Sequence, residues 1–294
     1  MKYRPLPLAL VAAALLGTST FGAQSKPTDI YAGVVDKNGD AVTGLTAADF
    51  RVREDGVVRE VQKAGVATDQ LTIALLVDDS QAASRALQMM REALDTFIGA
   101  LDGKAEIAII TFGDRPTIAV DYTTDRKKLL DAAHRIFPRQ GGGAYLLDAI
   151  VDASKGLQKR EVPRRVIAVL TIDDEIEFSN RQYTQVLDEL DKSRAALHVV
   201  TLGTPSSSQV DEMRNRNQVI AIGTERTGGR RDNVLAYTGA APHMKQLANE
   251  LIYQYKVTYA RPETLIPPER IEVTVSKPGL TARSRTRNPE AGAR

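Results

Sequence analysis

Three apolar runs in the middle of the sequence restrict the possible folds more than any other feature. They are Leu71–Asp78, Val166–Ile172 and Leu197–Leu202, and each is apolar almost throughout. Such runs are typical of strands that are covered by helices on both faces of a sheet. Between them, apolar residues return at helical spacing, for example from Leu87 to Leu101. The alternation predicts an α/β fold, a doubly wound, Rossmann-like domain with a mostly parallel sheet.

One edge of this sheet is expected to be antiparallel. The apolar runs Ile107–Phe112 and Thr117–Val120 are separated only by the short link from Gly113 to Pro116. A parallel crossover needs about a dozen residues or more, whereas an antiparallel pair needs only a tight turn. We therefore expect these two runs to form a hairpin at the sheet edge.

The two ends of the chain have a different pattern, which is typical of β-hairpins. Turn dipeptides stand at Asn38-Gly39 and Asp55-Gly56, between short alternating runs. Near the C-terminus, three more short runs indicate strands, at Tyr253–Tyr259, Arg270–Val275 and Leu280–Arg285. Because isolated hairpins are only marginally stable, we expect the two flanks to pair into a small β-sandwich-like domain.

These patterns divide the chain into five parts. We expect a signal peptide at residues 1–23, an N-terminal β segment at 24–69, the α/β domain at 70–254, a C-terminal β segment at 255–285 and a flexible tail at 286–294.

The sequence pattern predicts secondary structure weakly in one region of the α/β domain and strongly in another. The polar stretch 204–238 predicts only a short helix near Val210–Ile220, followed by a loop. The last helix is much clearer, because its apolar residues share one face. They are Met244, Leu247, Ala248, Leu251, Ile252 and Tyr255.

The charge of the chain gives no reason to expect a nucleic-acid partner. The formal net charge is +2, and both excess charges, Lys2 and Arg4, lie in the predicted signal peptide. Proteins that bind nucleic acid through their surface carry a basic excess. The arginines near the C-terminus are expected to be a solvated run. They are Arg283, Arg285, Arg287 and Arg294.

Residue usage also removes several chemistries. The sequence has no cysteine, so it offers no disulfide, no thiol nucleophile and no cysteine-ligated zinc. The three histidines, His134, His198 and His243, are too widely spaced to suggest a shared metal ion. We expect each of them to be a structural or surface residue.

The first residues are typical of an export signal. Lys2 and Arg4 form a positive start, Leu8–Leu16 is almost wholly apolar, and small residues follow as far as Ala23. The apolar run is too short for a stable membrane-spanning helix, and no later run is long enough. We therefore expect a periplasmic or secreted protein without a membrane span.

Three loops of the α/β domain resemble those of von Willebrand factor A domains. Asp78-Asp79-Ser80-Gln81-Ala82 is similar to the first loop of the family's metal-ion-dependent adhesion site, which reads Asp-x-Ser-x-Ser. Gly141-Gly142-Gly143-Ala144 is similar to the second loop, and Thr171-Ile172-Asp173 falls where the third loop usually presents Thr-Asp-Gly. The flanking β segments, for example at Glu54-Asp55-Gly56, resemble a bacterial exported subgroup of this family.

The departures from this pattern concern the metal ligands. The resemblance implies that an aspartate, two serines, a threonine and a second aspartate, with waters, hold a divalent cation. In this sequence Ala82 replaces the second serine and Ala144 replaces the threonine. Ile172 stands at the usual position of the second aspartate, and Asp173 follows one residue late. Since a methyl group cannot bind a hard cation, we expect a degenerate site.

Two functions remain open on this basis. We expect a protein–protein interaction or scaffolding module that works without a cofactor and is not an enzyme. The alternative is an adhesion module that binds a divalent cation (Mg, Mn or Ca) weakly through Asp78, Ser80 and Asp173. In both cases the binding rim lies at the carboxyl ends of the strands. The rim comprises Asp78, Asp79, Ser80, Gln81, Ala82, Gly142, Gly143, Ala144, Asp173 and Asp174.

Enzyme classes find less support in the residues. A receiver domain fits the acidic pair Asp78-Asp79, but no lysine follows the strand Leu197–Leu202 to neutralise a phosphoryl group. Ser80 replaces the second aspartate of an Asp-x-Asp-x-Thr phosphatase. The triplet Gly141–Gly143 lacks the Gly-Lys-Ser/Thr ending of a phosphate-binding loop, and the sequence has no Gly-x-Ser-x-Gly elbow. A hydrolase of unknown type is therefore the most distant alternative.

Overall fold

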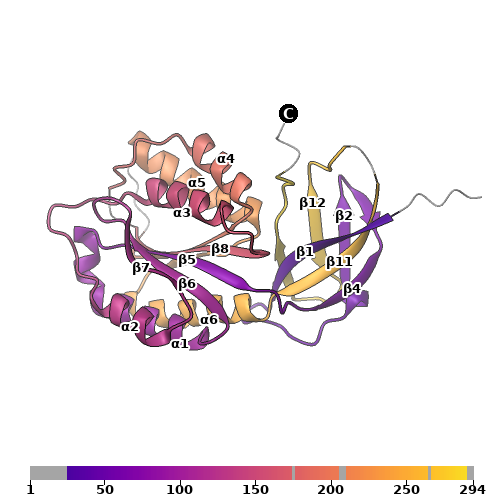
Figure 1. Cartoon of the computed structure of the whole chain (residues 1–294), viewed down its shortest axis with the longest axis horizontal. Coiled ribbons are helices and arrows are strands. Elements are labelled where there is room, and N and C mark those ends of the chain that lie inside the picture. The colour runs from indigo at the N-terminus through magenta and orange to yellow at the C-terminus, as the bar shows by residue number, and fades with distance from the viewer. Residues whose placement is uncertain (1–24, 174–175, 205–209, 264–265, 290–294) are drawn as a thin grey trace, which may run out of the picture.

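The computed structural model describes residues 25–173, 176–204, 210–263 and 266–289. These residues form two lobes, a larger α/β domain and a smaller β lobe to which both ends of the chain contribute (Figure 1). The predicted signal peptide at 1–23 lies outside the described residues.

A six-stranded sheet, counted over the described residues, forms the centre of the α/β domain. Neighbouring strands are parallel except for the last pair, β6 and β7, which is antiparallel. This arrangement confirms the predicted mostly parallel sheet with one antiparallel edge. In spatial order the strands are β10 (Arg231–Val234), β9 (Ala196–Leu202), β8 (Arg164–Ile172), β5 (Leu71–Val77), β6 (Ala105–Thr111) and β7 (Thr117–Thr123).

Helices of the described chain cover both faces of this sheet (Figure 1). One face carries α1 (Leu87–Ala100), α2 (Arg126–His134) and α6 (Ala240–Ile252), and the other α3 (Leu146–Gln158), α4 (Tyr183–Ser193) and α5 (Asp211–Thr227). Strand β5 shows why its sequence is apolar without alternation. Ile73 and Leu75 belong to the core on the α1 face, whereas Ala74 and Leu76 belong to the core on the α3 face. Because successive side chains of a strand point to opposite faces, a doubly covered strand must be apolar throughout.

The β lobe consists of two small antiparallel sheets within the described ranges. The first has the order β13 (Thr281–Ser284), β1 (Ser25–Val35), β11 (Tyr255–Pro262) and β4 (Val61–Val66), and the second β12 (Ile271–Val275), β2 (Phe50–Glu54) and β3 (Val57–Arg59). The two sheets share a core that includes Ile30 and Val257 from one and Phe50 and Val52 from the other. Strand β1 pairs with both β11 and β13, so the two flanks of the sequence meet as predicted.

A buried polar network joins the two lobes. Glu250 of α6 is 2% exposed and accepts two hydrogen bonds of 3.1 Å from Nη1 of Arg283 in β13. Arg230 Nη1 lies 3.6 Å from a Glu250 carboxylate oxygen and donates to the carbonyl oxygen of Gly39 at 3.0 Å. A Cβ at Gly33 of β1 would lie only 2.7 Å from Glu250 Oε1, so this approach requires glycine. The contacts fix how the β lobe sits on α6.

The polar stretch 204–238 holds more regular structure than its sequence predicts. Helix α5 continues to Thr227, well beyond the predicted short helix, and β10 then adds a strand parallel to β9. Tyr255 is predicted both on the last helix and in the strand Tyr253–Tyr259. In the structure α6 ends at Ile252 and Tyr255 begins β11, as the strand prediction has it. Its hydroxyl accepts from Leu45 N at 3.0 Å and donates to Val42 O at 3.1 Å, so the β lobe binds it.

The predicted flexible tail is wrong for its first residues. Thr286 N donates to Arg226 O at 3.0 Å, and Asn288 N donates to Glu269 O at 3.1 Å. Asn288 is only 6% exposed. These hydrogen bonds hold the chain against α5 and the β lobe, and the segment 290–294 lies outside the described residues.

The predicted solvated run of arginines is also wrong for Arg283 and Arg285. The first pairs with Glu250, as described above, and the second donates from Nη1 to Asp191 Oδ1 at 3.2 Å. Both arginines therefore carry structural ion pairs.

Among the described helices, none combines the length and the apolar character that a membrane span requires.

Candidate functional site

The three motif-bearing loops meet at the carboxyl ends of β5 and β8. Asp78 follows β5 directly, and its side chain is buried. Its Oδ1 accepts a hydrogen bond from Ser80 N at 3.0 Å, and its Oδ2 accepts from Thr171 Oγ1 at 2.9 Å and from Ile172 N at 3.0 Å. Both oxygens of this buried carboxylate are thus held by protein donors, which is how a buried carboxylate charge is stabilised.

Asp79 is also buried and links the first loop to its neighbours. Its Oδ1 accepts from Gly113 N at 2.5 Å, and its Oδ2 accepts from Arg139 Nε at 2.9 Å. A Cβ at Gly113 would lie 2.4 Å from the Asp79 backbone, so the close approach depends on glycine. Asp79 therefore holds the loops together and does not face a partner.

Gln81 binds the first loop to the second. Its backbone N donates to Gly142 O at 3.2 Å, and its Oε1 accepts from Gly141 N at 3.0 Å. The neighbouring Ala82 is half-buried and packs against the apolar core. A methyl group thus occupies the position where the resemblance implies a serine ligand.

The third loop folds over the second. Ala144 N donates to Ile176 O at 3.1 Å, and Phe178 N donates to Ala144 O at 2.7 Å. A Cβ at Gly143 would lie 1.9 Å from the Phe178 ring, which therefore rests directly on the glycine. The ring also stacks on Tyr145, with the two ring centroids 6.0 Å apart.

Arg216 of α5 brings a buried cation to the same strand ends. Arg216 is fully buried, with 0% of its surface exposed. Nη2 donates to Ile172 O at 2.9 Å and to Thr171 Oγ1 at 3.5 Å, and Nη1 lies 3.5 Å from Asp173 Oδ1. Because Thr171 Oγ1 also donates to Asp78, one hydroxyl connects the guanidinium to the carboxylate of the first loop.

Glu177 is a second buried ionisable residue of the third loop, 1% exposed. Its Oε1 accepts from Ser179 N at 3.1 Å and from Leu147 N at 3.5 Å, whereas its Oε2 has no hydrogen-bond partner among the described residues. Burial raises the pKa of Glu177 to about 7, although the charge of Arg216 acts in the opposite direction.

The sequence reasoning missed both Arg216 and Glu177. Arg216 stands in the polar stretch that was hardest to assign, and its signal is its place between Met213 and Ile220, at helical spacing on the buried side of α5. Glu177 alternates with the exposed Ile176 and Phe178, so it points inward as they point outward.

These residues do not fit a divalent cation. Magnesium requires a nearly octahedral cage of oxygen ligands. Ala82 and Ala144 provide methyl groups, both oxygens of Asp78 accept protein hydrogen bonds, and Arg216 adds a positive charge to the same strand ends. In the part of the chain that the structure describes, no group of three or more His, Cys, Asp or Glu residues is arranged to hold a metal ion.

The exposed part of the site differs from the predicted rim. Several predicted rim residues are buried, and Asp174 lies outside the described residues. The buried ones are Asp78, Asp79, Ser80, Gly143 and Ala144. The surface is instead an open pocket of about 500 Å³ that Gln81, Arg85, Gly142, Ile176 and Phe178 help to line. Ile176 is 56% exposed and Phe178 50%, so two large apolar side chains stand at its border.

Comparisons with known proteins agree with this architecture. Residues 73–175 match the sequence profile of the von Willebrand factor type A domain. A solved structure of a von Willebrand factor type A protein from Catenulispora acidiphila aligns with a TM-score of 0.51 at 11% identity, over 93% of this chain and 78% of that one. No curated protein sequence matches.

A second similar fold comes from the mussel byssus. Proximal thread matrix protein 1 aligns with a TM-score of 0.54 at 16% identity, over 68% of this chain and 50% of that chain. A further structure of the same mussel protein, with a zinc-occupied adhesion-site motif, gives a TM-score of 0.51 at 14% identity. At these identities the likeness concerns the fold alone. Together with the profile match over residues 73–175, it shows that the α/β domain has the fold of a von Willebrand factor type A domain.

Proposed function

We propose that this chain is an exported protein-interaction module that binds a protein partner without a metal ion. The partner would dock on the loops at the carboxyl ends of β5 and β8. The observation that carries the proposal is the buried guanidinium of Arg216, which donates to Ile172 O and stands 3.5 Å from Asp173 Oδ1. A permanent positive charge of the protein itself therefore lies beside the third loop, whose aspartate the family pattern uses as a metal ligand.

Because the acidic side chains of the first loop are buried, the partner would be bound by the exposed surface of the pocket beside them. Phe178 and Ile176 provide exposed apolar area, and Gln81 and Arg85 provide polar groups beside them. Aromatic and arginine side chains are the usual anchors of protein interfaces, and a polar rim normally surrounds them. The Phe178 ring is held by Gly143 and Tyr145, so little side-chain freedom is lost when a partner covers it.

No enzymatic role is included in the proposal. The two buried acids of the first loop, Asp78 and Asp79, accept hydrogen bonds from protein donors on both carboxylate oxygens. Domains of this family are generally interaction modules, and the exposed pocket lacks a nucleophile beside a base. Export is proposed from the basic and apolar pattern of residues 1–23.

The test is a comparison of partner capture by two surface variants in the presence of a chelator. Phe178→Asp places a charge at the centre of the proposed surface. Ile118→Asp places the same charge on the edge strand β7, where Ile118 is 63% exposed and does not line the pocket beside Phe178. We expect wild type and Ile118→Asp to retain the same partner from an extract of the source cells, and Phe178→Asp to lose it.

Two outcomes would contradict the proposal. Capture that disappears in chelator for wild type would show that a metal ion is needed. Capture that Phe178→Asp retains in full would place the interface elsewhere on the molecule.

A further inference from the structure

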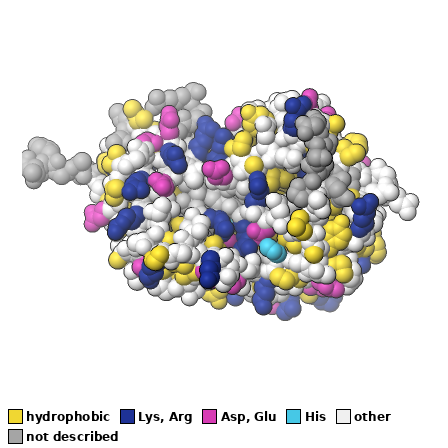
Figure 2. Space-filling model, turned by 180° about the vertical axis from the view of Figure 1, so that it is seen from behind, with side chains coloured by type: hydrophobic (Ala, Val, Ile, Leu, Met, Phe, Trp, Pro, Cys, Tyr) yellow, Lys and Arg dark blue, Asp and Glu magenta, His cyan; other side chains and the backbone are white. Residues whose placement is uncertain are grey.

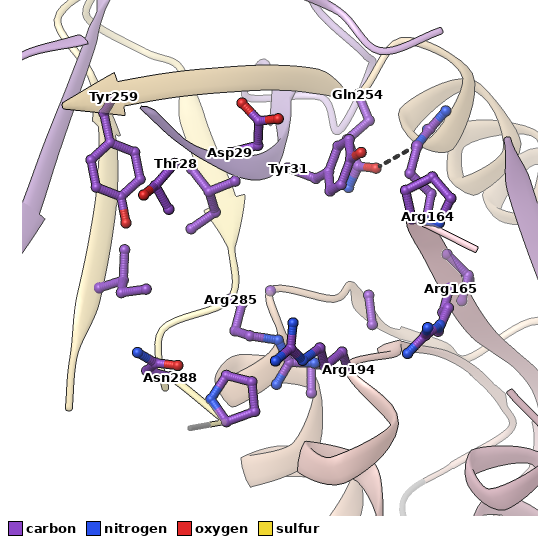
Figure 3. Close-up of a pocket in the computed structure, with 18 of the residues that line it drawn as sticks. Thr28, Asp29, Tyr31, Arg164, Arg165, Arg194, Gln254, Tyr259, Arg285 and Asn288 are labelled. Carbon is purple, nitrogen blue, oxygen red and sulfur yellow. Dashed lines mark hydrogen bonds between the residues drawn. The ribbon is translucent and has the colours of Figure 1, made fainter. Parts of the chain in front are cut away.

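The second site of interest lies between the two lobes, far from the three loops. A cavity of about 290 Å³ separates the start of β8 from strands β1 and β11, and its walls come from both lobes (Figure 3). Seen from behind, the surface is hollowed between the lobes, and Lys and Arg side chains lie beside the hollow (Figure 2). We propose that this inter-lobe cavity binds a small anion that carries two or more negative charges.

The side chains that line the cavity are strongly basic. Asp29 is the one acidic residue among the described lining residues, and its carboxylate is already 3.2 Å from Lys256 Nζ. Against it stand five arginines. They are Arg164, Arg165, Arg194, Arg261 and Arg285. A chain whose charges are otherwise nearly balanced thus concentrates positive charge in one cavity.

Two of these arginines have hydrogen bonds to neutral acceptors. Arg164 donates from Nε to Gln254 Oε1 at 3.2 Å, as Figure 3 shows, and also to backbone carbonyl oxygens. Arg165 donates from Nη1 to Ser193 O at 2.9 Å, and its buried Nε has no hydrogen-bond partner among the described residues. Burial lowers the pKa of both guanidinium groups. A buried donor without a partner costs free energy, and an anion in the cavity would remove that cost.

Asp191, an acidic residue next to the cavity, is shared between two arginines. Asp191 accepts from Arg285 Nη1 at 3.2 Å and from Arg226 Nη1 at 3.1 Å. Burial lowers the pKa of Arg285 to about 10, and the charges of Arg194 and Arg226 add to the effect. These contacts leave an excess of positive charge on the lower wall of the cavity in Figure 3, where Arg285 and Arg194 lie together.

The upper wall repeats this arrangement. Glu54 pairs with Arg59 Nε at 2.9 Å and with Arg261 Nε at 3.4 Å, and it also accepts from the Tyr259 hydroxyl at 2.8 Å. One carboxylate therefore faces two arginines here as well. The positive charge of the cavity thus comes from both lobes, and an anion between them would be attracted by each.

The chemistry and size of the cavity restrict the ligand. Guanidinium groups match the planar oxygens of carboxylates and phosphates, and Thr28 and Asn288 add neutral polar groups to the wall. A volume of about 290 Å³ is near the lower limit for small-molecule sites, so the ligand has to be small. Phosphoryl compounds and polycarboxylates share the required chemistry.

Calorimetric titration of the purified full chain tests the proposal, with inorganic pyrophosphate and citrate as separate probes at constant ionic strength. Arg165→Gln removes the charge and the unpartnered donor, and Arg165→Lys keeps the charge but loses the planar fork. Arg115→Gln, on the exposed turn before β7, is the matched control. Circular dichroism establishes which variants are folded.

We expect at least one probe to bind wild type and Arg115→Gln equally well. The affinity should fall about tenfold or more in Arg165→Gln and by a smaller factor in Arg165→Lys. Binding of pyrophosphate alone identifies a phosphoryl ligand, and binding of citrate alone a polycarboxylate. If Arg165→Gln does not fold, the affinity of Arg165→Lys for the probes is the test. Absence of binding for both probes, or unchanged affinity in every folded Arg165 variant, overturns the proposal.

Discussion

The guanidinium of Arg216 and the carbonyl oxygen of Ile172 are joined by a hydrogen bond of 2.9 Å at the end of β8. Ile172 is the residue that stands where the family pattern has an aspartate, so its apolar side chain turns into the core while its backbone oxygen binds the arginine. This hydrogen bond ties the third loop to α5, and Thr171 Oγ1 extends the connection to Asp78 of the first loop.

Substitution of Arg216 by methionine should strongly destabilise the domain. The methionine side chain has a similar length but removes the ion pair with Asp173 and the hydrogen bonds to Ile172 O and Thr171 Oγ1. Breaking a buried ion pair typically costs about 3–5 kcal/mol, which urea unfolding measures directly. Arg214→Ala is the control, because Arg214 is exposed on the same helix and pairs with the exposed Asp211, a contact that typically contributes less than about 1 kcal/mol. Equal stability of the two variants would show that the Arg216 network is unimportant.

Divalent cations should leave the stability of the wild-type protein unchanged. A cation present at ~100 times its dissociation constant would add about 2.7 kcal/mol, which a thermal melt detects easily. We expect the same Tm in chelator and in millimolar magnesium, manganese or calcium, because Ala82 and Ala144 offer no side-chain oxygen. A rise in Tm that Asp78→Ala abolishes would instead support the metal-dependent adhesion module.

The fold was predictable from the sequence because its strongest signals are physical necessities. Strand β5 is covered on both faces, so its seven residues are all buried and its sequence has to be apolar. The short link before β7 leaves only the antiparallel arrangement. Strand β10 was not predictable in this way, since Arg231 and Asn233 are exposed and the strand buries little besides Val234.

The candidate site was predictable only in its loops. The first-loop pattern correctly located Asp78 at a strand end, directly after β5. The sequence could not show that Arg216 reaches these loops, because a residue's contacts across the fold depend on how α5 packs. For the same reason it could not show that Glu177 lies inside and Phe178 outside.

The free energy of unfolding should depend on pH because the pKa of Glu177 is raised in the folded protein. Its pKa in the folded protein is raised from 4.5 to about 7, so the folded state binds this proton more tightly than the unfolded state does. The stabilisation is therefore complete below about pH 4.5 and is lost as the pH rises toward 7.

A neutral substitute removes this dependence. Glu177→Gln retains an Oε1 acceptor for Ser179 N and Leu147 N. We expect it to match wild type near pH 4 and to be more stable at pH 8, by on the order of 3 kcal/mol. Unfolding at both pH values measures the difference, and Glu60→Gln, at an exposed site in the β lobe, should show none. A constant difference between Glu177→Gln and wild type across this range would contradict the raised pKa.

Two glycine substitutions separate the exposed Phe178 surface from overall stability. In Gly143→Ala the new Cβ would lie 1.9 Å from the Phe178 ring, so the ring has to leave its place on the glycine. Such overpacking typically costs about 1–3 kcal/mol, and here it also displaces the proposed anchor. Gly156→Ala is the matched control, because Gly156 lies within α3 and its added Cβ meets no atom within 4 Å. Alanine should stabilise that helix by roughly 0.5–1 kcal/mol.

These two variants should therefore differ in both stability and binding. Gly143→Ala should melt at a lower temperature than wild type and capture less partner, whereas Gly156→Ala should melt at a higher temperature and capture the same amount. Thermal melts and the capture assay in chelator measure the two effects on the same preparations. If Gly143→Ala loses stability but keeps full capture, the position of the Phe178 ring does not matter for binding, and the interface has to be sought away from the third loop.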